Sequence, residues 1–203
     1  MLRDAASRLF RVRLCSLVIM HGNRAIASTD VLAFWRQAGY DRWYNKDDAF
    51  DAEVRHRFLD LWRAAAAGEL SSWEASDEGA LALTIVLDQF PRNMFRGEAR
   101  AFSSDAAALA VARRALARGA DARVDPELVQ FFYLPFMHSE QLADQLRCVA
   151  LFSKTPDGEN LKYAEEHADI IRRFGRFPHR NRALGRATTP EEQAFLDGGG
   201  FAG

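Results

Sequence analysis

Two segments of the chain place arginine and asparagine just after a Phe-Pro pair, with a histidine between the pair and the arginine in the second segment. The first is DQFPRN, residues 88–93, and the second is RFGRFPHRN, residues 173–181. Arginine guanidinium groups bind carboxylates and phosphates through two parallel hydrogen bonds, so both segments are candidates for an anion-binding site. The candidate ligand-binding residues in them are Asp88, Gln89, Arg92, Asn93, Arg173, Arg176, His179, Arg180 and Asn181.

The second segment is strongly basic. From Arg172 to Arg186 there are six arginines and one histidine, and no acidic residue. These arginines could instead pair with the chain's many Asp and Glu residues, in which case a buried Arg–Asp link would hold the two segments together. Phenylalanines interleaved with the arginines can stack nucleic-acid bases, but beside Gly and Pro they more often fix a loop on the core.

A third candidate is His138-Ser139-Glu140, which adds His138 and Glu140 to the ligand-binding candidates. Histidine titrates near neutral pH and a carboxylate can orient its ring, as general acid–base catalysis requires. Residues two apart do not share a face of a regular helix, so this pair would hold a metal ion only at an irregular helix start. A lone histidine is more often a structural residue, and packing is the default expectation for His167.

The common catalytic and cofactor motifs are missing. The sequence has no GxSxG elbow, no P-loop and no GxGxxG turn. The two cysteines, Cys15 and Cys148, form no CxxC and no spaced Cys/His set, so no zinc site, other metal or cofactor is expected. Cys148 lies in an apolar helical stretch and is expected in the core.

The composition is that of one globular domain. The chain has 203 residues, of which 48% are hydrophobic and 27% charged, and a formal net charge of −1. This charge gives no strong nucleic-acid signal, and no apolar run approaches the ~20 residues that span a bilayer. We expect a domain over residues 30–197 and a flexible tail over 198–203. Partners are expected to be a small anionic ligand or a protein or peptide.

The N-terminal arm, residues 1–29, is interpreted separately. Arginines precede a short apolar run, Leu14 to Met20, and Ala25-Ile26-Ala27 then resembles a small-residue cleavage site. That order gives a weak secretory signal. The apolar run is short and Asp4 and Arg24 are poorly placed for one, so the arm is as well explained by a non-native start and a cytoplasmic location is expected.

The elements that must position these residues all carry helical signals. Capping residues and breakers bound the expected helices at 29–39, 48–68, 76–91, 104–119, 125–135, 139–152, 161–175 and from 189. Pro91 is expected to end the third helix and Ser104 to cap the fourth. Asp125-Pro126-Glu127 is expected to start the fifth, which Pro135 interrupts.

An all-α fold follows from these signals. No segment shows sustained alternation of β-branched and polar residues, so a sheet is not expected. About seven or eight helices with short connections predict antiparallel helix pairs in an array or bundle.

Four stretches carry a family resemblance. They are FWRQAGYDRWY (34–44), DQFPRNMFRG (88–97), FFYLPFMHSE (131–140), and HADIIRRFGRFPHRNRALGR (167–186) with TTPEE after it. Together they resemble domain-of-unknown-function family 924, a bacterial family, over roughly residues 30–197. The resemblance implies a tetratricopeptide-like all-helical fold. It carries over no function and no catalytic residues, and Met137 stands where an acidic residue is expected in the family.

Three functions remain open on the sequence alone. The chain could bind an anionic small molecule or an acidic peptide through an Arg/His/Asn-lined pocket, which predicts that Arg92, Arg173, Arg176 and Arg180 lie on one concave surface. It could be a hydrolase or transferase acting on a phosphorylated or carboxylated small molecule, using His138 or His179 with a carboxylate. The polar motifs could also be purely structural.

Overall fold

The prediction of an all-helical fold is confirmed in a computed structural model that describes residues 20–21, 24–156 and 158–201. Within them the α-helices are α1 (Ser28–Tyr44), α2 (Asp48–Ala66), α3 (Asp77–Met94), α4 (Asp105–Ala117), α5 (Leu134–Met137), α6 (Leu142–Phe152), α7 (Gly158–Phe174) and α8 (Pro190–Asp197). Short 3-10 segments are η1 (Ser71–Ala75), η2 (Ala99–Phe102), η3 (Ala120–Ala122), η4 (Val129–Phe132) and η5 (Pro178–Arg180). Two-residue strands, β1 (Met20–His21) and β2 (Arg24–Ala25), pair antiparallel before α1.

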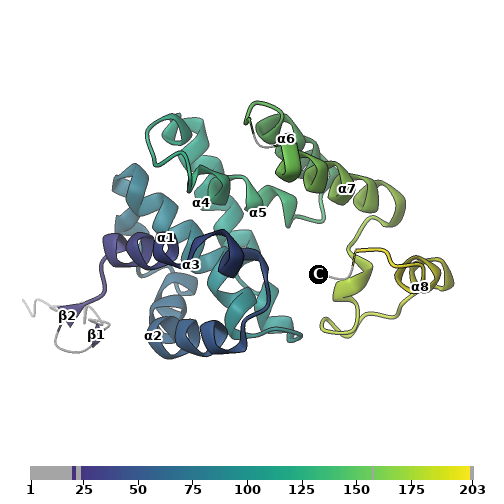
Figure 1. Ribbon diagram of the computed structural model, residues 1–203, viewed down its shortest axis with the longest axis horizontal. Helices are drawn as coiled ribbons and strands as arrows, with labels where there is room; N and C mark the ends of the chain where they lie inside the picture. Colours follow the sequence, from purple (N-terminus) through teal and green to yellow (C-terminus); the bar gives the residue numbers. More distant parts are fainter. Residues whose placement is uncertain (1–19, 22–23, 157, 202–203) are drawn as a thin grey trace, which may run out of the picture.

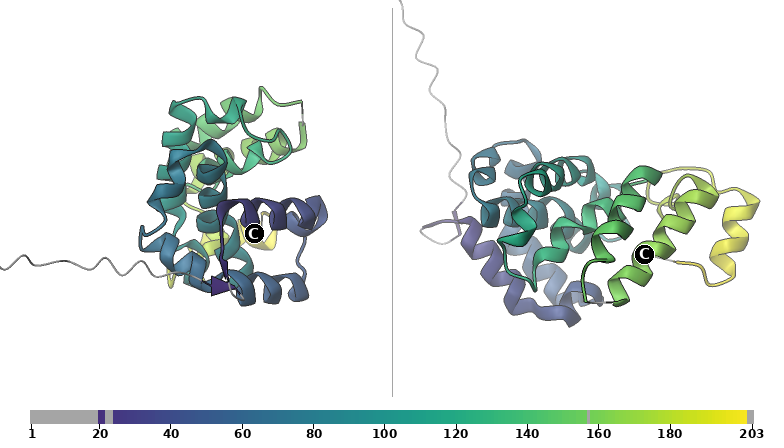
Figure 2. Two further views of the ribbon diagram at one scale, coloured as in Figure 1. Left: turned by 90° about the vertical axis from the view of Figure 1, so that its left-hand side faces the viewer. Right: turned by 90° about the horizontal axis from the view of Figure 1, so that it is seen from above.

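The helices follow one another along the long axis of the molecule, from α1 and α2 at one end to α8 at the other (Figure 2). Helix α3 lies at the centre of the group formed by the first four helices and packs against α1, α2 and α4 (Figure 1). Every residue from Gly79 to Pro91 is buried, as expected for a helix that other helices surround. Helices α6 and α7 form the next pair, and α8 packs beside η5.

Aromatic side chains from several helices meet around the middle of α3. Phe90 lies 4.7 Å from Phe58, 5.6 Å from Trp35 and 6.3 Å from Phe34, measured between ring centroids. All four side chains are buried. This contact set joins α1, α2 and α3 into one core and holds the C-terminal half of α3 in place.

The prediction that Pro91 ends the third helix is wrong, because α3 continues through Pro91 to Met94. Proline has no N–H, so it cannot bond the carbonyl of Leu87. The hydroxyl of Ser104 donates to that carbonyl at 2.6 Å, and the indole Nε1 of Trp62 donates to the same hydroxyl oxygen at 3.0 Å. The Ser104 hydroxyl therefore supplies the hydrogen bond that Pro91 cannot donate within α3. Its side chain does not cap α4 as predicted, because it makes no capping hydrogen bond there.

Removing this hydroxyl should weaken the fold measurably. We expect Ser104→Ala to lower the free energy of unfolding by about 1–3 kcal/mol, because two buried polar groups lose their partner. Urea denaturation would measure the change. Ser103→Ala is the matched control, since the exposed Ser103 hydroxyl bonds only the nearby Arg100 carbonyl. Equal stability of the two variants would show that the Leu87 carbonyl needs no such partner.

The segment before α6 also differs from the prediction. Asp125-Pro126-Glu127 does not start an α-helix, because the Asp125 carboxylate accepts the Glu127 N–H and shapes a turn that leads into η4. Pro135 lies in the first turn of α5 rather than interrupting a helix. Helix α6 begins at Leu142 instead of near 139. These differences place His138 at the end of α5, outside a regular helix.

The starts of α2 and α8 agree with the local signals, whereas the prediction that Gly39 ends the first helix is wrong. Asp47 caps α2 through its side chain, and Thr189 and Glu192 form the predicted capping box of α8. Gly39 kinks α1 with a φ of 71° instead of ending it, and Gly175 follows α7 with a φ of 69°. In the described ranges, no helix has the length and hydropathy needed to cross a membrane. Residues 1–19 of the arm lie outside the described residues.

Candidate functional site

A carboxylate–imidazole pair lies at the C-terminal half of α3. Asp88, whose side chain is 1% exposed, lies 2.8 Å from Nδ1 of His138 and accepts a hydrogen bond from Gln89 Nε2 at 2.5 Å. Arg92, one turn along α3, lies 3.3 Å from the same carboxylate. Burial raises the pKa of Asp88, but the charges of Arg92 and His138 and the hydrogen bonds outweigh it and bring this pKa to about 2. Asp88 is therefore ionised at neutral pH.

The ionised Asp88 determines which nitrogen of His138 carries the proton. A carboxylate can only accept, so Nδ1–H donates to it. Burial lowers the pKa of His138, and the nearby Arg92 lowers it further. Within the described part of the chain, Nε2 of His138 has no hydrogen-bond partner, and the side chain is 16% exposed. A neutral imidazole held in this way has the geometry of a general base.

The two Phe-Pro segments meet at Asp105, the first residue of α4. Arg92 donates two hydrogen bonds to the Asp105 carboxylate, at 2.9 and 3.1 Å. Arg180, which follows Asp105 by 75 residues in the sequence, lies 3.5 Å from the same carboxylate. It also donates to the backbone carbonyl of His138 at 3.0 Å. We call Asp88, Arg92, Asp105, His138 and Arg180 the Asp105 centre.

Arg180 is the most enclosed cation of this centre. Its side chain is 7% exposed, and its guanidinium lies 4.7 Å from the ring of Phe102 and 4.5 Å from that of Phe177. Its Nε is buried and has no hydrogen-bond partner among the residues that the structure describes. Burial lowers the pKa of Arg180 to about 10, and the charge of Arg92 adds to the effect. Burial and the charge of Arg92 therefore outweigh the attraction of the surrounding carboxylates.

Other candidates of the basic segment belong to a second cluster. Arg176 donates to Glu192 at 2.6 and 2.9 Å, and Asn181 donates to it at 3.1 Å. Glu192 also accepts the Thr189 N–H that closes the capping box of α8. The hydrogen bonds from Arg176 lower the pKa of Glu192 to about 2, against the effect of burial. We call Arg176, Asn181, Thr189 and Glu192 the Glu192 cluster, and its contacts anchor α8.

The remaining candidates are engaged in separate contacts. Glu140 accepts the Phe177 N–H at 2.9 Å and two hydrogen bonds from Arg186, at 2.8 and 3.0 Å. Asn93 donates to Asp51 at 2.7 Å. Arg173 lies over the rings of Phe174 and Phe195. Of the four arginines expected on one surface, Arg92 and Arg180 both contact Asp105. Arg176 instead pairs with Glu192, and Arg173 lies over two phenylalanine rings, so neither belongs to that surface.

Two histidines pack in an aromatic cluster. His167 lies 5.4 Å from the ring of Phe177 and 4.4 Å from that of Phe201, and His179 contacts the same two rings. Burial lowers the pKa of His167 to about 4 and that of His179 to about 3. Phe201, which the sequence places in a flexible tail, thus packs on the body of the protein.

This cluster should make stability depend on pH. The unfolded His167 takes up a proton near pH 6.5, whereas the folded one stays neutral to about pH 4, so acid favours unfolding. Between pH 7 and pH 4 the wild type should lose up to about 3 kcal/mol of stability through His167, and His167→Gln should not show this part of the loss. Urea denaturation across that range would measure the slope, with His56→Gln on α2 as the control. An unchanged slope in His167→Gln would contradict the assignment.

Sequence reasoning missed Asp105, which both arginines contact. The signal was an acidic residue in the first turn of the fourth expected helix, but such residues usually only balance the helix dipole. Glu192 and Arg186 were also missed as partners. Cys148 is buried as predicted, and burial raises the pKa of its thiol. Among the described residues, no three His, Cys, Asp or Glu side chains are grouped so as to hold a metal ion.

Comparison with known proteins identifies relatives of this chain. The model of the family described as bacterial protein of unknown function DUF924 matches residues 31–200. A solved structure, that of the protein of unknown function ATU0120 from Agrobacterium tumefaciens, is 48% identical with a TM-score of 0.81. The match covers 84% of this chain and 97% of that one. No curated protein matches the chain.

Proposed function

Since the chain belongs to the bacterial DUF924 family, whose function is unknown, we propose from its geometry that it binds a small anionic ligand at the Asp105 centre. The observation that carries the proposal is the state of Arg180. Its guanidinium is almost fully enclosed, its Nε has no hydrogen-bond partner in the described part of the chain, and its pKa is lowered to about 10. An anion beside Arg180 would accept a hydrogen bond from this Nε and stabilise the buried positive charge.

His138 adds a second donor to such a ligand. In the free protein its Nε2 has no hydrogen-bond partner within the described ranges, and its pKa is lowered. When an anion binds close by, protonation of Nε2 gives a charged N–H that can donate to it, while Asp88 stabilises the imidazolium from the other side. Binding would therefore take up a proton, and the affinity would rise as the pH falls from 7 towards 5.5.

Calorimetric titration with inorganic phosphate and with succinate tests the proposal. We expect saturable binding to the wild-type chain that weakens by about tenfold or more in Arg180→Gln, since one charged hydrogen-bonding group is lost. Arg173→Gln is the matched control, because Arg173 lies in the same segment but over Phe174 and Phe195. Circular dichroism would verify that both variants are folded.

Two results would oppose the proposal. One is the lack of saturable binding of either probe to the wild-type chain. The other is equal affinity of the wild type and a folded Arg180→Gln variant, which would make the Asp105 centre an architectural contact like the Glu192 cluster. The tetratricopeptide-like arrangement implied by the resemblance is compatible with a concave site, and an acidic peptide could supply the same anion as a small molecule.

The Asp88–His138 pair favours a second candidate, a hydrolase or transferase for phosphorylated or carboxylated small molecules. A neutral His138 oriented by a carboxylate could take a proton from water or a hydroxyl, while Arg92 and Arg180 stabilise the negative charge that develops. Hydrolysis of p-nitrophenyl phosphate and p-nitrophenyl acetate would be assayed. His138→Gln should lower any activity by about 10²–10⁴-fold, and His56→Gln should retain it. Activity that survives in His138→Gln would exclude this role.

A further inference from the structure

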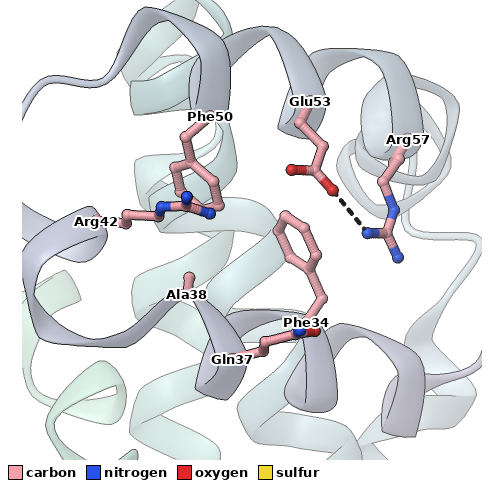
Figure 3. Close-up of a pocket in the computed structure, with 7 residues that line it drawn as sticks. All are labelled: Phe34, Gln37, Ala38, Arg42, Phe50, Glu53 and Arg57. Atoms are coloured by element: carbon pink, nitrogen blue, oxygen red, sulfur yellow. Dashed lines mark hydrogen bonds and ion pairs between the residues drawn. The ribbon is translucent and has the colours of Figure 1, made fainter.

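We propose that a cleft between α1 and α2 binds a small carboxylic acid that has a flat apolar body. The cleft has a volume of about 410 Å³, which is at the small end of the range for ligand sites. Side chains from both helices point into it, as Figure 3 shows. None of them belongs to the Asp105 centre or the Glu192 cluster.

The floor of the cleft is aromatic. The rings of Phe34 and Phe50 are stacked with centroids 5.5 Å apart and an interplanar angle of 10°. Phe34 projects from α1 toward the middle of the cleft, with Ala38 one turn further along the same helix (Figure 3). Both phenylalanines are buried in the core beneath. Phe34 is 7% and Phe50 2% exposed, so a flat apolar group would meet a small but rigid aromatic contact area.

Arg42 supplies an open guanidinium at one side of this floor. Its guanidinium lies 5.6 Å from the centroid of Phe50, and its side chain is 53% exposed. Its nearest carboxylate, Asp47, lies 3.7 Å away in an ion pair, and Arg42 donates no hydrogen bond among the described residues. Although Asp47 pairs with Nε, the N–H groups of the planar fork can still donate two hydrogen bonds to a carboxylate.

The opposite side of the cleft is already neutralised. Arg57 lies 4.5 Å from the centroid of Phe34 and donates to Glu53 at 2.9 Å. The amide of Gln37 has no hydrogen-bond partner within the described residues and also lines the cleft. Arg57 is hydrogen-bonded to Glu53, whereas Arg42 has only the longer ion pair with Asp47. The cleft accordingly suits a single carboxylate, with its apolar body against Phe34 and Ala38.

Benzoate is the probe for this site, followed by NMR shifts of α1 and α2 amides and by calorimetry. We expect saturable binding that weakens by about tenfold or more in Arg42→Gln, because a charged hydrogen-bonding pair is lost. Arg36→Gln is the matched control, since Arg36 lies on the same helix, is 49% exposed and pairs with Asp125 outside the cleft. Acetate and benzyl alcohol, which lack the ring or the charge, should each bind more weakly than benzoate.

The same measurements contain the results that would overturn the proposal. If benzoate saturates no α1 or α2 shift, the cleft is not a carboxylate site. Equal affinity in folded Arg42→Gln and wild type would also exclude it. Arg180→Gln separates this site from the Asp105 centre, because benzoate affinity should remain unchanged there. Loss of benzoate binding in a folded Arg180→Gln variant would show that benzoate binds at the Asp105 centre and not in the cleft.

Discussion

Replacing Asp88 with alanine should lower the free energy of unfolding by about 3–5 kcal/mol, because the change removes one member of a buried charged network. Asp88 holds Nδ1 of His138 and Nε2 of Gln89, and it lies 3.3 Å from Arg92. All three groups would remain enclosed with fewer partners. For a chain of this length the melting temperature should fall by roughly 10 °C.

Urea denaturation and a thermal melt would measure the loss. Asp60→Ala is the matched control, because Asp60 is also a helix aspartate paired with an arginine, but its side chain is exposed. It should change stability by no more than about 0.5 kcal/mol. A loss in Asp88→Ala that is no larger than in Asp60→Ala would contradict the buried network.

A double-mutant cycle with Asp88→Asn and His138→Gln would isolate their interaction. Residues in one hydrogen-bond network are typically coupled by about 0.5–3 kcal/mol. Asp88→Asn also removes the charge that orients the His138 ring, so the proton uptake expected on anion binding should decrease. This readout distinguishes a positioning role of Asp88 from a purely structural one.

Phe90→Ala should lower the free energy of unfolding by about 3–5 kcal/mol as well, for a different reason. The Phe90 ring is fully buried and contacts Phe34, Trp35 and Phe58. Its removal leaves a cavity where α1, α2 and α3 meet, and the neighbouring rings cannot fill it without leaving their own contacts.

Chemical denaturation would again measure the change, with Phe90→Leu as a graded variant that should lose less. Tyr163→Ala is the surface control, because Tyr163 is an exposed aromatic residue; it should stay within about 0.5 kcal/mol of the wild type. A stability loss in Phe90→Ala below 1 kcal/mol would mean that this core collapses easily around the missing ring. Because Phe90 lies between Gln89 and Pro91 on α3, binding of phosphate should also be measured in any variant that remains folded.

Local signals in the sequence predicted the helical class and several boundaries. Helix α2 begins at residue 48 as expected, Gly175 follows α7, and the Thr189–Glu192 capping box opens α8, because each of these signals acts within a single turn. The family resemblance agrees with the match over residues 31–200. The sequence also indicated which residue types could bind an anion, since guanidinium and imidazole chemistry does not depend on the fold.

Tertiary structure decided the rest, because the deciding partners are distant in the chain. Pro91 stays inside α3 since Ser104, 17 residues from Leu87, supplies the missing donor. Arg92 and Arg180 meet only because α4 brings Asp105 between them. Neighbouring arginines of one basic segment thus have different partners, Arg176 at Glu192 and Arg180 at Asp105. Sequence spacing determines what a side chain can do chemically, whereas long-range packing determines which partner it meets.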